Sequence, residues 1–296
     1  MKLKRPDLMK QLKKPYIFGA VATKLFFFAL CASFLPLQAQ ETVVIKGSDT
    51  LGAKLVPQLA EAYKNAGHNV NFEIAAEGSS TAFSNLIAGT TDIGMSSRQV
   101  EDKEKADATS KGIELVEKIA AYDMIAIIVN QNNPVQELTL QQVEEIFTGE
   151  VMDWSEIGGS AGEISVYTRN TASGTYKDFQ KLAMNKRDYG ANAQKMAGNE
   201  QIATEVGKNP NGIGYVGLAY SSAEGIVQVA VNGLLPEAKN ATTYVLSRAT
   251  YYYTNGEAAG EVKTFLDFCL GKEGDEMVEQ VGFIPVSKSA AQATND

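Results

Sequence analysis

Three turns in the sequence carry hydroxyl side chains directly ahead of segments with helical spacing: 48–50, 79–80 and 173–175. A helix N-terminus has unpaired N–H groups and a partial positive charge, so a hydroxyl beside it completes a set of donors for an anion. Arg169 precedes the third turn, and its guanidinium can pair with two oxygens of a tetrahedral oxyanion at once. The third turn is therefore a candidate oxyanion site.

The same turns also fit a purely structural interpretation. Ser and Thr are the usual N-caps of helices, and three such caps are ordinary in an α/β protein. The residues alone leave both interpretations open, although Arg169 ahead of Ser-Gly-Thr strengthens the case for an anion site at the third turn.

Alternating strands and helices are expected to position these turns. The spacing predicts strands at 41–46, 70–75 and 92–95 and helices at 51–66 and 82–88. This alternation favours an α/β domain with a largely parallel sheet. Further along, the pattern predicts strands at 119–129, 163–168, 213–216, 226–231 and 243–246. It also predicts helices at 140–147, 264–270 and 276–281, and one that runs from the third turn to residue 184.

Composition excludes several classes of protein. The 296 residues allow two domains, and the two cysteines are too few for a disulfide scaffold. His68 is the only histidine, which argues against a His-rich metal site and leaves one candidate base for a catalytic triad. A net charge of −8 argues against a nucleic-acid surface.

Residues 1–39 have the layout of a secretory signal peptide: a basic start, a charge-free apolar run at 25–37 and a small-residue cleavage site ending at Ala39. An uncleaved anchor is the alternative, whereas Leu30 before Cys31 fits a lipoprotein signal poorly. Residues 1–39 contain seven basic residues and one acid. Their removal leaves a chain with 20 basic and 34 acidic residues, a net charge of −14.

Several strings resemble the periplasmic phosphate-binding proteins of ABC transporters, the PstS type. They are KGSDTL at 46–51, EGSSTA at 77–82, TDIGMSSR at 91–98, LTLQQVEEIFTGEVMDWSEIGG at 138–159, RNTASGTY at 169–176, NPNGIGYVG at 209–217 and GFIPV at 282–286. They occur in the family's order, and the resemblance covers nearly all of residues 43–287.

The resemblance implies an α/β, two-lobed periplasmic-binding-protein fold of type II with the ligand in the cleft between the lobes. Lobe one would comprise 42–122 plus 247–296 and lobe two 123–246, with crossover strands at 122–129 and 243–251. The protein would capture inorganic phosphate outside the cytoplasm and deliver it to ABC transporter permease subunits. It would be a monomer with no cofactor, no metal, no catalytic residue and no nucleic-acid partner.

The resemblance also assigns the ligand-binding residues. They are Thr50, Leu51 (through its backbone), Ser79, Ser97, Arg98, Arg169, Ser173, Gly174 (through its N–H) and Thr175.

One position departs from the best-known pattern of the family, which has an Asp where this chain has Ser97. That carboxylate accepts the proton of hydrogen phosphate and repels sulfate, whereas a serine imposes no charge penalty on sulfate. Arg98 either contacts the anion or braces its loop by pairing with a carboxylate such as Glu77 or Asp49. A receptor for sulfate, molybdate or tungstate is therefore an alternative.

A phosphoester hydrolase is the rival from another class, but the sequence offers one poorly placed histidine and no clustered carboxylate motif. Other notable residues have structural interpretations. We expect Trp154 and 251–253 to be packing residues, the carboxylates of 101–107 to lie on a solvated helix face, His68 to be exposed and 177–178 to occupy the first turns of a helix.

Overall fold

Strands and helices alternate through the first part of the computed structural model, which describes residues 40–288. The expected signal peptide and Cys31 lie outside the described residues. The order is β1 (Glu41–Gly47), α1 (Asp49–Gly52), α2 (Leu55–Asn65), β2 (Val70–Ala76), α3 (Ser79–Ala88), β3 (Ile93–Ser96) and α4 (Asp102–Ser110). Strand β1 lies between β2 and β3 and is parallel to both. This confirms the α/β alternation that the sequence predicts.

The second part of the chain begins with the longest described strand, β4 (Leu115–Asn130). It continues with β5 (Glu137–Leu138), α5 (Leu140–Thr148), η1 (Trp154–Ile157), β6 (Ser165–Arg169), α6 (Gly174–Ala183), β7 (Gln194–Met196), α7 (Asn199–Lys208), β8 (Gly212–Gly217), η2 (Leu218–Tyr220), β9 (Ile226–Val231) and η3 (Ala238–Asn240). The chain then returns through β10 (Ser247–Asn255) to α8 (Gly260–Cys269) and α9 (Lys272–Val281).

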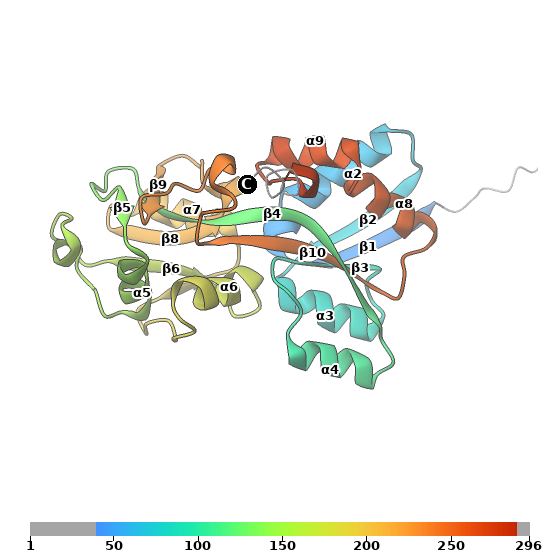
Figure 1. Cartoon of the computed structure of the whole chain (residues 1–296), viewed down its shortest axis with the longest axis horizontal. Coiled ribbons are helices and arrows are strands. Elements are labelled where there is room, and N and C mark those ends of the chain that lie inside the picture. Colours follow the sequence, from blue (N-terminus) through green and yellow to red (C-terminus); the bar gives the residue numbers. More distant parts are fainter. Residues whose placement is uncertain (1–39, 289–296) are drawn as a thin grey trace, which may run out of the picture. The chain divides into compact units, whose positions relative to one another are not determined.

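Two long strands connect the two halves of the described chain (Figure 1). The first half comprises β1–β3, α1–α4, α8 and α9, and the second half comprises β5–β9 and α5–α7. Strand β4 pairs with β10 over 115–124 and then with β8 and β9 over 125–130, while β10 also pairs with β3. Strands β4 and β10 are thus the two crossover strands of a type II periplasmic-binding-protein fold.

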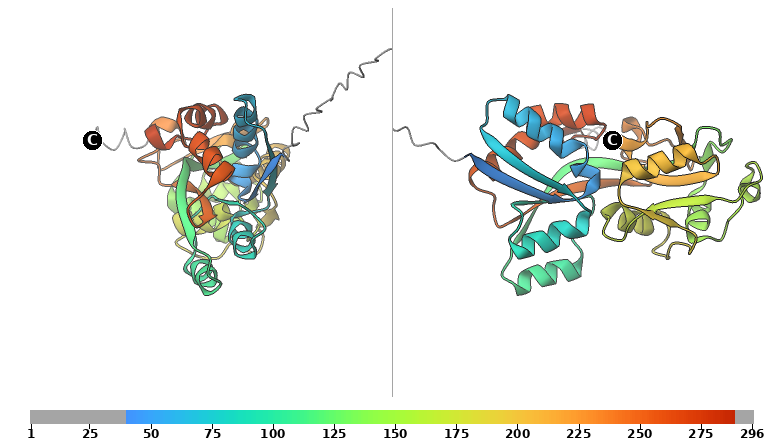
Figure 2. Two further views of the ribbon diagram at one scale, coloured as in Figure 1. Left: turned by 90° about the vertical axis from the view of Figure 1, so that its right-hand side faces the viewer. Right: turned by 180° about the vertical axis from the view of Figure 1, so that it is seen from behind.

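Each half has its own apolar core. In the first half, α2, α8 and α9 cover one face of the sheet and α3 covers the other (Figure 2). The tyrosines of β10 alternate between these faces, with Tyr252 on the first and Tyr251 and Tyr253 on the second, as the two-residue period of a strand requires. In the second half, Trp154 is buried in the core and donates its indole N–H to the carbonyl of Asn211 at 3.2 Å. Both sets of aromatic residues are packing residues, as expected.

The structure corrects several local predictions. The segment 243–246 is a turn because the N–H groups of Thr243 and Tyr244 bond back to the carbonyl of Asn240, so β10 begins only at Ser247. The expected helix 51–66 is two helices, interrupted at Lys54, whose φ of −129° is not helical. His68 is half-buried rather than exposed, and its ring stacks on Tyr63 at 3.7 Å.

The sequence pattern does not predict α7 or β7. Helix α7 is short, and Gly207 weakens its intrinsic helix propensity, so tertiary packing of Ile202, Ala203 and Val206 stabilises it. Within residues 40–288, none of the helices has the length and apolar character needed to span a membrane.

Candidate functional site

The three hydroxyl-bearing turns meet at the carboxyl ends of β1, β2 and β6. Each strand runs directly into a helix N-terminus, and ligands of open α/β sheets bind at such edges. We call five buried side chains the hydroxyl cluster: Thr50, Ser79, Ser97, Ser173 and Thr175. They come from both halves, so the site is assembled where the halves meet.

Thr50 and Thr175 are the first contact across the two halves. Their hydroxyl oxygens lie 3.0 Å apart, so one of the two donates to the other. Thr50 belongs to α1 and Thr175 to the first turn of α6. Leu51 follows Thr50 in α1, and its side chain is wholly buried in the core of the first half.

Ser79 and Ser97 form the second pair of hydroxyls. Their oxygens lie 3.2 Å apart, and the backbone N–H of Ser97 donates to the hydroxyl oxygen of Ser79 at 2.9 Å. This N–H fixes the Ser79 oxygen as an acceptor. The proton of one hydroxyl and a lone pair of the other then remain available to a ligand.

Gly174 explains how the halves can approach so closely. A Cβ built on Gly174 would lie 2.6 Å from the hydroxyl oxygen of Ser97 and would also collide with that of Ser79. Ser173, just before it, caps α6 by accepting the N–H of Tyr176 at 3.3 Å. Because that oxygen accepts the cap bond, the Ser173 proton is free to point away from the helix.

Arg169 brings a positive charge to the site. It ends β6, is 1% exposed, and donates from Nη2 to the carbonyl of Ala197 at 2.8 Å. Its Nη1 lies 3.2 Å from Oδ2 of Asp49, yet within the described residues neither Nη1 nor Nε has a hydrogen-bond partner. Burial lowers the pKa of Arg169, and the charge of Asp49 opposes that shift. A buried guanidinium with unpaired N–H groups is suited to bind an anion.

Arg98 is not brought into the hydroxyl cluster. Its two terminal nitrogens form a bidentate pair with Glu104 of α4 at 2.7 and 2.8 Å, and Nη2 also donates to Ser80 at 3.2 Å. Burial by itself lowers the pKa of Arg98, but Glu104 and then Glu101 raise it overall. Arg98 braces its loop, with Glu104 as its partner in place of the expected Glu77 or Asp49.

The expectation that the carboxylates of 101–107 form a solvated face is wrong for Glu104, which is partly buried, whereas Glu101 is exposed as expected, although it is paired. Glu104 binds Arg98, and Glu101 accepts both of its hydrogen bonds from Lys177 at 2.7 Å. Lys177 does occupy the first turns of α6, but it also reaches Glu101 in the other half.

Backbone groups close the contact between the halves beside the site. The N–H of Ser80 donates to the carbonyl of Ala172 at 3.1 Å. A Cβ on Gly78 would lie 2.7 Å from that same carbonyl oxygen, and the φ of Gly78 is +126°, so only glycine suits this position.

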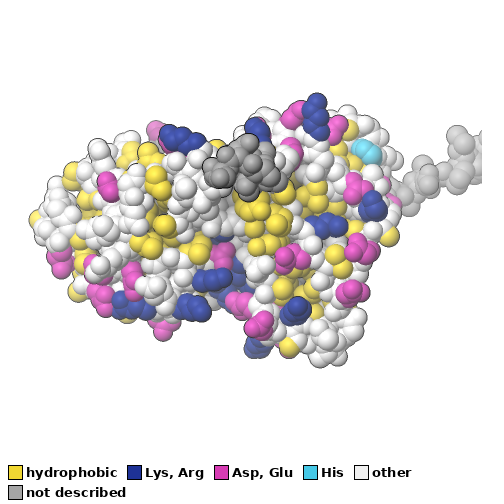
Figure 3. Space-filling model, viewed as in Figure 1, with side chains coloured by type: hydrophobic (Ala, Val, Ile, Leu, Met, Phe, Trp, Pro, Cys, Tyr) yellow, Lys and Arg dark blue, Asp and Glu magenta, His cyan; other side chains and the backbone are white. Residues whose placement is uncertain are grey.

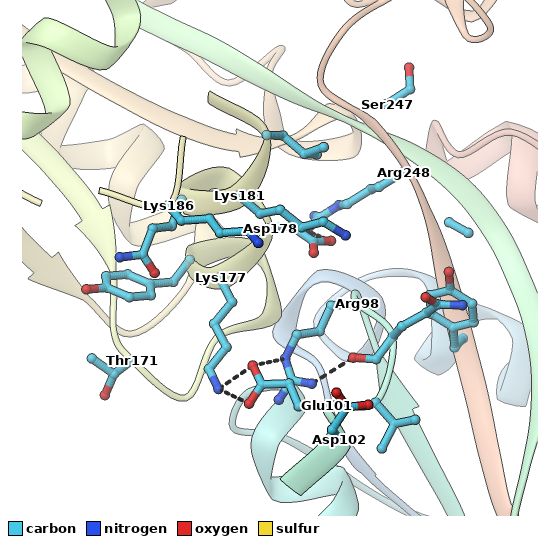
Figure 4. Close-up of a pocket in the computed structure, with 17 residues that line it drawn as sticks. Arg98, Glu101, Asp102, Thr171, Lys177, Asp178, Lys181, Lys186, Ser247 and Arg248 are labelled. Carbon is cyan, nitrogen blue, oxygen red and sulfur yellow. Dashed lines mark hydrogen bonds and ion pairs between the residues drawn. The ribbon is translucent and has the colours of Figure 1, made fainter. Parts of the chain in front are cut away.

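A pocket of about 930 Å³ opens on the far side of this contact, between the loop 98–102 and α6 (Figure 4). Its lining includes Lys177, Asp178, Lys181 and Arg248. On the face shown in Figure 3, Lys and Arg side chains gather where the halves meet, interspersed with Asp and Glu. Arg248, which lines this pocket, also donates from Nη2 to the hydroxyl oxygen of Thr175 at 3.0 Å.

Three polar residues of the site are not predicted from the sequence, namely Asp123, Asn199 and Arg248, and Asp49 is expected there only as a partner of Arg98, whereas it pairs with Arg169. Asn199 begins α7, and its N–H and side-chain amide both donate to Oδ2 of Asp49, at 3.0 and 2.7 Å. Asp123 pairs with Arg248 at 2.8 Å. One signal was present, because Asp123 stands alone as a charge within the apolar run 119–129, and a charge in a buried strand requires a partner.

Fold and site together are those of a periplasmic-type binding protein, with buried hydroxyls and a buried guanidinium where its two halves meet. Residues 36–273 match the family model described as the PBP superfamily domain. Two relatives are phosphate-binding proteins PstS. The one from Pseudomonas aeruginosa is 34% identical, with 83% of each chain covered, and the one from Bacillus subtilis is 29% identical, with 84% of this chain and 82% of the relative covered.

Solved structures agree with this assignment. A putative phosphate ABC transporter substrate-binding protein with bound phosphate from Clostridium perfringens is 34% identical, with a TM-score of 0.77, over 83% of this chain and 100% of that one. An ABC-type phosphate transport receptor from Vibrio cholerae is 27% identical, with a TM-score of 0.67, over 82% and 99% of the two chains. The chain belongs to the PBP superfamily and, within it, to the PstS family of phosphate-binding proteins.

Proposed function

We propose that this protein captures inorganic phosphate outside the cytoplasm and delivers it to the permease subunits of an ABC transporter. The observation that carries the proposal is the buried guanidinium of Arg169, which lies beside five buried hydroxyls. Among the described residues its Nη1 and Nε have no hydrogen-bond partner, although Nη1 lies in an ion pair with Asp49. The printed functions of the PstS relatives and of the Clostridium perfringens protein support phosphate as the ligand.

In this proposal the anion is held by Thr50, the backbone of Leu51, Ser79, Ser97, Arg169, Ser173, the N–H of Gly174 and Thr175. The N-termini of α3 and α6 add their partial positive charge. Each hydrogen bond that involves a charged group contributes about 1.5–3 kcal/mol net, so several together can offset the hydration of a small dianion. Arg98 serves as a brace and makes no contact with the anion.

The two halves act as the two lobes, with boundaries at 122/123 and 246/247, and β4 and β10 act as the hinge. Binding in the cleft draws the lobes together, which signals occupancy to the permease. We further propose that the chain is exported through the signal peptide 1–39 and that it acts as a monomer without a cofactor, enzymatic activity or nucleic-acid partner. The sequence pattern of residues 1–39 and the family of binding proteins support these points.

Replacing Arg169 tests the assignment of the site. Arg169→Ala removes the buried charge, and we expect a loss of about 2–5 kcal/mol in phosphate binding, at least about thirtyfold in Kd. Isothermal titration calorimetry measures it. Arg187→Ala is the matched control, because Arg187 is exposed and pairs with Glu144 and Glu150 rather than with a residue of the hydroxyl cluster. Equal phosphate affinity in the Arg169 variant and the control would place the site elsewhere.

A receptor for another tetrahedral oxyanion is the second candidate, and Ser97 is the observation that favours it. Neither Ser97 nor Ser79 carries the charge that repels a fully deprotonated anion such as sulfate. However, a serine oxygen with a free lone pair still accepts a bond from a protonated phosphate oxygen, which sulfate does not offer. Competition by sulfate, molybdate and tungstate separates the candidates.

A further inference from the structure

Asp123 and Arg248 form a buried ion pair on the two crossover strands. They face each other directly in the antiparallel register of β4 and β10. Nη2 and Nε of Arg248 donate to Oδ2 of Asp123 at 2.8 and 3.2 Å, and Oδ1 of Asp123 accepts the N–H of Leu218 at 3.0 Å. Asp123 is wholly buried and Arg248 is 7% exposed, so the position of the guanidinium is fixed by its partner.

Arg248 also reaches the hydroxyl cluster. Its Nη2 donates to the hydroxyl oxygen of Thr175 at 3.0 Å, so Thr175 is an acceptor in that bond. Thr175 in turn contacts Thr50, whose oxygen accepts the side-chain amide of Asn199 at 3.4 Å. Each threonine oxygen therefore accepts a hydrogen bond from a donor outside the pair.

The count of donors and acceptors in the Thr50–Thr175 pair shows which way its spare proton points. The two hydroxyls own two protons, and one of them is used in the bond between the threonines. The other proton has no place toward Arg248 or Asn199, because both of those groups are donors. It must point out of the pair, whichever threonine carries it, so the pair presents a donor to its surroundings.

The energetics of the Asp123–Arg248 ion pair also indicate a role other than stabilising the fold. A buried ion pair seldom adds stability relative to well-packed apolar residues, because desolvating both charges is costly. Arg248 also turns Nη1 toward the pocket, 3.8 Å from Asp178, where Nη1 has no hydrogen-bond partner among the described residues (Figure 4). A side chain that serves packing alone does not need this charge.

We propose that Arg248, held by Asp123, is a positioning residue of the phosphate site that sets the Thr50–Thr175 pair as a hydrogen-bond donor to the anion. The inference rests on the proposed function. It has a consequence for specificity, because a donor favours a deprotonated oxygen. The pair thus contributes to affinity for the phosphate dianion more than for the monoanion.

A mutant cycle tests this assignment. The double variant Asp123→Asn/Arg248→Met removes both charges together and leaves no unpaired ion. We expect it to weaken phosphate binding by about three- to tenfold, the effect of losing one oriented hydrogen bond. In a Thr175→Val background the same double change should cause no further loss, because it acts through the Thr175 hydroxyl. In a Ser79→Ala background the loss should persist.

A pH series adds a readout that a structural role would not move. Phosphate affinity is measured across the pH range in which phosphate exchanges its second proton. The double variant should show a weaker preference for the dianion than the wild type. If circular dichroism shows that the double variant does not fold, Arg248→Lys replaces it in the same mutant cycle. This substitution keeps a positive charge opposite Asp123.

The outcomes are distinguishable. Equal losses in the wild-type and Thr175→Val backgrounds, or an unchanged affinity and pH profile, overturn the role of Arg248 and leave the proposed function intact. If the wild type binds no phosphate, the proposed function fails and takes this inference with it.

Discussion

Asp178 is a partly buried carboxyl group, and the charges around it shift its pKa in opposite directions. It lies in α6, three residues after Thr175, and faces Nη1 of Arg248. Burial raises the pKa of Asp178, and Asp123 adds to that shift, while Arg248, Lys181 and Arg98 oppose it. The sequence assigned this residue only to the first turns of a helix, whereas in the structure it belongs to the charge network behind the site.

Replacing Asp178 with Asn should stabilise the protein at neutral pH. A carboxyl whose pKa is raised on folding favours the folded state below its unfolded pKa, and that contribution is lost as the pH rises through the folded value. Asp178→Asn removes the cost of ionisation, so its gain in the free energy of unfolding should be present at neutral pH and vanish in acid. Urea unfolding at both pH values measures it, and a variant less stable than the wild type at neutral pH contradicts this interpretation.

At the scale of elements, a residue at a helix N-terminus can cap the helix and can also bind a ligand. Ser173 caps α6 through its oxygen and is proposed to donate its proton to the anion. Thr139 caps α5 in the same way, accepting the N–H of Gln142 at 3.1 Å, but it lies on an exposed helix start in the second half. The two residues thus separate the structural role of a cap from the binding role, which the sequence left open.

Ser173→Ala and Thr139→Ala form a matched pair of variants. Each should lower the free energy of unfolding by about 0.5–2 kcal/mol, the usual effect of losing an N-cap. Only Ser173→Ala should also weaken phosphate binding, because only its hydroxyl faces the cluster. Chemical denaturation and calorimetry of both variants decide the matter. If the two variants bind phosphate equally, Ser173 is merely a cap.

At the scale of the whole molecule, a set of contacts holds the two halves together beside the site. The ion pair between Lys177 of the second half and Glu101 of the first is one of them, and both side chains are partly exposed. An exposed ion pair contributes about 0.2–1 kcal/mol, so it modulates closure and does not determine it.

Lys177→Gln should therefore raise the dissociation rate of phosphate about 1.4- to fivefold, because it weakens the closed state. Stopped-flow fluorescence measures this rate, and high salt should reduce the difference between variant and wild type. Lys263→Gln is the control, since Lys263 pairs with Asp267 within α8 and joins no halves. An unchanged rate in the Lys177 variant shows that the pair does not hold the lobes together.

The sequence predicted local structure better than long-range pairing. Apolar periodicity located β1, β2, β3, β4 and β9, because the spacing of buried side chains follows directly from strand and helix geometry. The pairs Asp49–Arg169 and Asp123–Arg248 join residues more than a hundred positions apart, and nothing in the spacing of a lone acid or base shows its partner. The serine-bearing turns could be predicted from the sequence. Their meeting at one place could not, because it depends on the order of the strands in the sheet.

The most direct test of the account is a calorimetric titration of phosphate into ligand-free wild-type protein, repeated in excess sulfate. We predict saturable binding at one site that survives sulfate, because only a protonated phosphate oxygen can donate to the Ser79–Ser97 pair. If phosphate produced no saturable binding, the account of the site would be contradicted. If sulfate abolished phosphate binding, the protein would be a general oxyanion carrier.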